Sequence, residues 1–90
     1  MTLDMYRKNL YVFWVQTDTG IVLQNVNTNH FIELDKIQEK VWEYLDGTFS
    51  EKDIAKVLAK QNMNIMEPEL LETVKSTVAI LLDYDLISQN

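Results

Sequence analysis

Apolar residues are spaced along the chain as in β-strands up to Asp35, and as in α-helices beyond it. Before Asp35, runs rich in β-branched and aromatic residues predict three strands, which cover residues 11–16, 21–24 and 30–34. The segments between them, Thr17–Gly20 and Asn25–Asn29, have turn chemistry, and we expect Gly20 to take a positive φ. Short loops between consecutive strands predict an antiparallel meander.

Three helices are predicted after the meander. Asp35 is expected to cap the first, Ser50 the second, and Glu67-Pro68 opens the third, since proline loses nothing at a helix start. Asp46-Gly47 ends the first helix, with Gly in a left-handed conformation, and Tyr84-Asp85 ends the third. The expected core stripes of the three helices are Ile37, Val41, Trp42 and Leu45; Ile54, Val57 and Leu58; and Leu71, Val74, Val78, Leu81 and Leu82, with Leu70 widening the last.

The two ends of the chain are predicted to differ. Residues 1–9 are polar and form an expected loosely ordered lead-in, whereas Leu86-Ile87 should fold back onto the core. The first strand, residues 11–16, is apolar on both faces, so its outward face should also meet a partner surface. The 90 residues suit one domain of α+β class, a three-stranded antiparallel meander followed by a three-helix bundle.

Charge and composition exclude several functions. The formal net charge of −6, with only 8 Lys and Arg, argues against nucleic acid and anionic membranes as partners. The sequence has no cysteine, no signal-peptide pattern and no apolar run of about 18 residues, so a cytoplasmic location is expected.

The sequence offers little catalytic chemistry. His30 alone cannot form a metal site, and on a strand it is expected to be structural or exposed. Glu33 should point off the sheet while Asp35 caps a helix, so the two carboxylates are not expected to act as a pair. Two glycines cannot form a phosphate-binding loop. We therefore expect no catalytic residue, no metal and no cofactor.

The assembled motifs resemble a known family. Ile32-Glu33-Leu34-Asp35, Val41-Trp42, the run from Leu45 to Ser50, and Ile54-Ala55 are similar in type and spacing to the PqqD-like family. The resemblance covers roughly residues 21–87, with Asp35 where Asn is usual. These domains, also called RiPP recognition elements, are bacterial, winged-helix-like and free-standing or fused to enzymes. They bind the leader of a ribosomally made precursor peptide and present it to modifying enzymes.

The resemblance implies a peptide-binding groove in this chain. The edge strand at residues 30–34 would accept the leader as an added strand, and the third helix would form the opposite wall. The predicted contact residues are His30, Phe31, Ile32, Glu33, Leu34, Leu70, Val74, Lys75, Val78 and Leu82. Lys75 would pair with an acidic leader residue, although the apolar helix residues also suit a core and the lysine also suits a solvated face.

The implied partners are a precursor leader and a modifying enzyme, which could be a radical SAM enzyme, a cyclodehydratase or a leader protease. The chain is expected to be a free-standing monomer or weak homodimer. Two alternatives stay open. A non-leader interaction or dimerisation module would suit the apolar first strand, while a winged-helix DNA-binding regulator would need more basic residues than Lys75 on its third helix.

Overall fold

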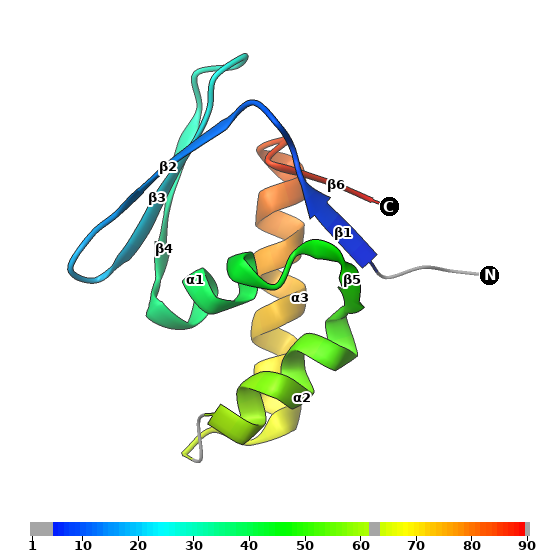
Figure 1. Ribbon diagram of the computed structural model, residues 1–90. Coiled ribbons are helices and arrows are strands. Elements are labelled where there is room, and N and C mark those ends of the chain that lie inside the picture. The colour runs from blue at the N-terminus through cyan, green and yellow to red at the C-terminus, as the bar shows by residue number, and fades with distance from the viewer. Residues whose placement is uncertain (1–4, 62–63, 90) are drawn as a thin grey trace.

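The computed structural model describes residues 5–61 and 64–89, which form six strands and three helices (Figure 1). The elements in chain order are β1 (Met5–Lys8), β2 (Val12–Gln16), β3 (Gly20–Asn25), β4 (Phe31–Asp35), α1 (Lys36–Glu43), β5 (Asp46–Ser50), α2 (Glu51–Gln61), α3 (Glu67–Asp83) and β6 (Ile87–Gln89). The three predicted strands and three predicted helices are therefore confirmed.

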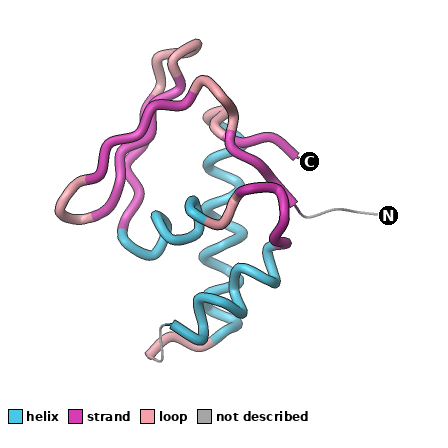
Figure 2. The backbone as a smooth tube through the Cα atoms, viewed as in Figure 1, coloured by secondary structure: helices cyan, strands magenta, loops and turns pink. Residues whose placement is uncertain are grey.

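The strands form two antiparallel sheets. The first, in the order β2-β3-β4, is the predicted meander, and we call it the meander sheet. The second, in the order β5-β1-β6, joins distant parts of the chain, and we call it the terminal sheet. Figure 2 shows the two sheets above α2, on either side of the upper end of α3.

The terminal sheet corrects the expected lead-in. Within residues 1–9, Met5–Lys8 form β1, the central strand of that sheet, while residues 1–4 lie outside the described part. Its partner strands, β5 and β6, are separated from it by about half the chain or more, so a local sequence pattern cannot predict the pairing. The predicted return of Leu86 and Ile87 is confirmed, since both are buried and Ile87 begins β6.

The turn between β2 and β3 differs from the prediction in one detail. Gly20 does not have a left-handed φ; instead, a Cβ at this position would collide with the backbone carbonyl of Leu34 in the neighbouring strand. Glycine is therefore needed for close approach of two strands. In the next turn, Asn29 takes the left-handed conformation (φ 67°) expected of that asparagine-rich segment.

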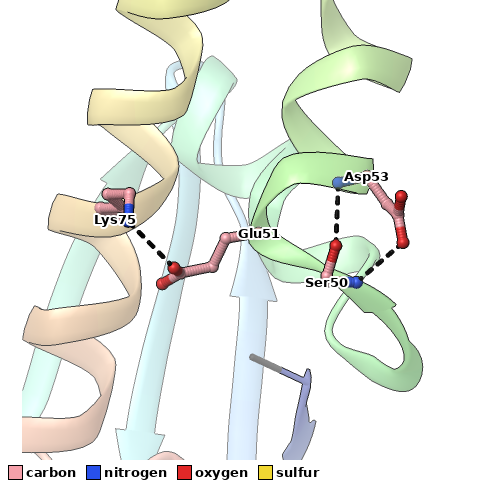
Figure 3. A network of polar contacts seen from close by, with 4 residues as sticks. All are labelled: Ser50, Glu51, Asp53 and Lys75. Atoms are coloured by element: carbon pink, nitrogen blue, oxygen red, sulfur yellow. Dashed lines mark hydrogen bonds and ion pairs between the residues drawn. The ribbon is translucent and has the colours of Figure 1, made fainter. Parts of the chain in front are cut away.

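The helix ends follow the predicted chemistry. Asp35 accepts a hydrogen bond from the Gln38 N–H, and the Gln38 side chain accepts one from the Asp35 N–H, which forms a capping box. Ser50 and Asp53 make the same reciprocal pair at the start of α2 (Figure 3). Gly47 has the expected positive φ of 92°, but it lies within β5, and α1 already ends at Glu43.

One hydrophobic cluster connects the elements. It includes Leu23 from the meander sheet, Val41 and Trp42 from α1, Leu58 from α2 and Leu81 from α3, all buried. The stripes predicted for the three helices therefore supply most of the core. Two predicted positions are wrong: Leu82 is 41% exposed, and Val57 lies outside the cluster. Within this cluster α1 packs against both β4 and α3.

Candidate functional site

The outer edge of β4 is open in the described structure. In the meander sheet β4 pairs only with β3, and the Asn25 N–H donates to the His30 carbonyl. Because antiparallel strands alternate between bonded and non-bonded pairs, Ile32 and Leu34 direct their backbone groups toward β3. Phe31 and Glu33 therefore direct their N–H and C=O groups away from the sheet, where another strand could bond to them.

The predicted β4 side chains divide between the two faces of the sheet. Leu34 is buried and Ile32 is half-buried on the core face, where they pair with Ile21 and Leu23 of β3. Phe31 and Glu33 are exposed on the outer face. His30 precedes the strand, and its ring meets the ring of Tyr84 edge-on at 6.0 Å.

The predicted α3 residues are placed less favourably for a peptide. Leu70, Val74 and Val78 are buried in the core, so their side chains offer almost no surface. Lys75 is exposed and forms an ion pair with Glu51, at 3.6 Å, in the first turn of α2 (Figure 3). Leu82 follows Lys75 by seven residues, so it lies on the same side of the helix, facing away from the core stripe.

The side of α3 nearest to β4 carries different residues. A cavity of about 220 Å³ lies between His30, Asp83 and Tyr84, at the point where the start of β4 meets the end of α3. Ile80 and Ser76 precede Asp83 by three and seven residues and share its side of the helix. Ile80 is also half-exposed and lies outside the hydrophobic cluster. At about 100° per residue, it lies about 140° around the helix from Lys75.

The sequence analysis did not single out Ser76, Ile80 and Asp83, because it extended the core stripe of the third helix to one side only. The signal was available, since Ile80 is an apolar residue outside the spacing of Val74, Val78 and Leu81. The sequence could not show which side of α3 is nearer to β4.

The opposite edge of the meander sheet, β2, borders a larger cavity. It has a volume of about 360 Å³ and is lined by Lys8, Trp14, Gln16, Ile21, Glu39, Trp42 and Glu43. Burial lowers the pKa of Lys8, whose amine lies 5.1 Å from the centre of the Trp42 ring, while Asp46 and Glu43 act to raise it. The buried Glu39 accepts a hydrogen bond from Gln16 at 2.5 Å. We call this space the β2 pocket.

Residues 5–61 and 64–89 contain no group of three or more His, Asp and Glu side chains arranged to hold a metal ion. Within these ranges, none of the helices has the length and apolar character required to cross a bilayer.

Comparison with solved structures identifies the fold. One match, TbiB1 in complex with the TbiA(beta) leader peptide, is 15% identical with a TM-score of 0.78, covering 93% of this chain and 96% of that one. Another, lasso peptide synthetase B1 complexed with the leader peptide, is 18% identical with a TM-score of 0.78, covering 92% and 96%. This chain has the fold of these two B1 proteins.

The shared fold agrees with the fold class predicted from the sequence. The α+β arrangement predicted from the sequence pattern is confirmed, and the structural match spans nearly the whole of both chains. No protein-family model and no curated protein sequence matches the chain. The fold is therefore recognisable where overall sequence similarity is low.

Proposed function

We propose that the chain is a peptide-binding protein that captures the leader segment of a ribosomally made precursor as a fourth strand on β4. The main observation in favour of this proposal is the open edge of β4, where the N–H and C=O groups of Phe31 and Glu33 point away from β3. His30, just before this strand, shares a cavity with Asp83 and Tyr84 at the end of α3. Backbone bonds of this kind hold an extended peptide whatever its sequence. The two B1 proteins of the same fold, both in complex with a leader peptide, support this reading.

Side-chain selection would come from the α3 wall. A strand added to β4 alternates its side chains between the two faces of the sheet, so every second residue would face α3. There it would meet Ile80, Ser76 and, at one end, the cavity between His30 and Tyr84. We infer that an apolar leader residue packs on Ile80. We also infer that Asp83 favours a basic leader residue, whereas the sequence analysis expected an acidic leader residue paired with Lys75.

The bound peptide would then be presented to a modifying enzyme, and the chain itself would perform no chemistry. The candidate enzymes are a radical SAM enzyme, a cyclodehydratase or a leader protease, and the encounter would take place in the cytoplasm. Leader affinity would lie in the range of about nanomolar to micromolar, which suits a carrier that must release its cargo.

Titration of labelled protein with the leader from a neighbouring precursor gene tests the proposal. Amide signals of Phe31, Glu33 and the Ile80 side of α3 should shift, while those of β2 should not. Ile80→Lys should weaken binding by about tenfold or more, because it puts a charge where apolar contact is expected. Lys75→Glu is the matched control, since Lys75 faces Glu51 rather than β4, and it should bind the leader as the parent does.

Two outcomes would refute parts of this scheme. If the shifted amides map to another surface, the added-strand geometry is wrong. If Lys75→Glu weakens binding and Ile80→Lys does not, the peptide lies on the other side of α3, as the sequence alone suggested.

A second candidate function is a protein interaction module that does not bind leaders. The observation in its favour is the outer face of the meander sheet, where Phe13, Val15 and Phe31 are exposed and lie on the same side. Binding of an unrelated leader and the cognate leader with equal affinity, or of neither, would favour this alternative.

A further inference from the structure

The edge strand β2 lacks the features that normally keep sheet edges apart. Val12–Gln16 contains no charged residue, no proline and no irregularity in its pairing with β3. Three of its side chains are largely exposed, with Phe13 at 67%, Trp14 at 59% and Val15 at 64%. On the other edge of the same sheet, β4 carries Glu33 and Asp35. The two edges are therefore chemically different.

The backbone directions of β2 follow from the adjoining turn. The Thr17 N–H donates to the Gly20 carbonyl, and the Val26 N–H donates to the Tyr11 carbonyl. In an antiparallel pair every second residue bonds to the neighbouring strand. Because Tyr11 and Thr17 do so, the backbone groups of Phe13 and Val15 also point toward β3. Those of Val12, Trp14 and Gln16 consequently face outward, and Trp14 is the middle one of the three.

We propose that β2 is a homodimer interface, at which a second copy of the chain adds its own β2 in antiparallel register about a two-fold axis at Trp14. This register pairs Trp14 with Trp14 and Val12 with Gln16 through outward-facing backbone groups. It also places Phe13 opposite Val15, an aromatic and β-branched pair of the kind that stabilises sheets. The two-fold axis repeats the Phe13–Val15 contact on both sides of Trp14, as an isologous interface requires.

The absence of charge in β2 permits a second copy to approach this edge, although the chain has a net charge of −6. The strand itself has no charged side chain, so the two copies of Val12–Gln16 do not oppose carboxylates directly across the seam. The carboxylates beside it, Glu39 and Glu43, line the β2 pocket together with the Lys8 amine, and Glu39 accepts a hydrogen bond from Gln16. Continuing the register places Asp18 of one copy opposite Leu10 of the other, two residues from its Lys8. Trp14 lines the β2 pocket, so the two indoles would meet between the two pockets.

The dimer would be a continuous six-stranded sheet with a β4 edge at each end. Each copy would therefore keep its peptide-binding edge, and leader binding and dimerisation would be independent. Such an interface would be formed mainly by the five residues of each β2, so we expect reversible association that depends on protein concentration.

A charge exchange at Trp14 tests the two-fold axis. Trp14→Lys and Trp14→Glu each place like charges directly opposite one another, so each variant alone should sediment as a monomer at concentrations where the parent forms dimers. An equimolar mixture should recover the dimer. Phe31→Lys, on the outer face of β4, is the control and should associate as the parent does.

The register can be tested separately because the sequence has no cysteine. Trp14→Cys should form an intermolecular disulfide readily on mild oxidation, since bonded antiparallel pairs have Cα atoms about 5.5 Å apart. Phe13→Cys should crosslink much more slowly, because its symmetry mate is displaced along the strand.

Three results would overturn the proposal. The first is a parent protein that stays monomeric at all concentrations, and the second is Trp14 variants that associate as the parent does. The third is a parent protein that uses β2 to bind a different protein and does not bind a second copy of itself. Leader binding by the Trp14 variants, measured alongside, should be unchanged, so failure here is distinct from failure of the peptide-binding proposal.

Discussion

At the scale of single residues, Trp42 connects the first helix to both sheets. It is only 4% exposed and belongs to the hydrophobic cluster, and the amine of Lys8 from the terminal sheet lies over its ring. Trp42→Ala should lower the free energy of unfolding by about 3–5 kcal/mol, because it removes a large buried side chain and leaves a cavity. Urea denaturation of parent and variant measures this loss. An unchanged midpoint would show that the indole does not pack in the core.

Asn25 is the residue whose role sequence reasoning identified least well. It lies in a segment with three asparagines that predicted a turn, and the turn is present. Yet Asn25 itself is fully buried: its amide donates to the Tyr84 and Asp85 carbonyls, and its side-chain oxygen accepts from the N–H groups of Asn27 and Thr28. The partners 59 and 60 residues away are invisible to a local pattern.

At the scale of elements, periodicity predicted those strands and helices that have a face of their own to bury. The meander and the three helices were found for this reason. β1, β5 and β6 are short strands whose identity depends on one another, and residues 5–8 carry no alternation that would distinguish a strand from a polar segment. Their pairing is a property of the tertiary fold, which a single sequence does not display.

The edge of β4 allows a prediction that separates folding from peptide capture. Proline removes one backbone donor, and its effect depends on where that donor points. Glu33→Pro removes an outward N–H, so the protein should fold but bind the leader much more weakly. Ile32→Pro removes a bond to β3 and should destabilise the domain itself.

Thermal denaturation and leader titration of both variants provide the measurement. The sequence alone leaves the assignment of these two neighbours undecided, whereas the hydrogen bond from Asn25 to His30 determines it. Normal leader binding by a folded Glu33→Pro protein would mean that no strand is added here.

At the scale of the whole molecule, residues from the first third of the chain are hydrogen-bonded to the turn that follows α3. Asn9 and Asn25 donate side-chain hydrogen bonds to the carbonyl of Asp85, and the Tyr11 hydroxyl donates to the Asp85 carboxylate, which raises the pKa of that tyrosine. Asp85 itself has a left-handed backbone, φ 56°, just after α3 ends. The terminal sheet and the meander sheet therefore meet at one point of the backbone.

This arrangement predicts that β1 unfolds together with the core rather than separately from it. As the central strand of the terminal sheet, β1 is bonded on both sides, to β5 and β6, and Ile87 of β6 is buried in the cluster. Backbone amides in Tyr6–Lys8 that bond to those strands should therefore exchange with solvent as slowly as amides in the middle of α3, through global opening. Hydrogen exchange followed by NMR measures both regions in one sample.

Ile87→Ala should lower the free energy of unfolding by about 2–5 kcal/mol, and it should accelerate exchange in β1 and α3 by the same factor. Fast exchange in β1 beside slow exchange in α3 would instead restore the loosely ordered N-terminal segment that the sequence alone suggests.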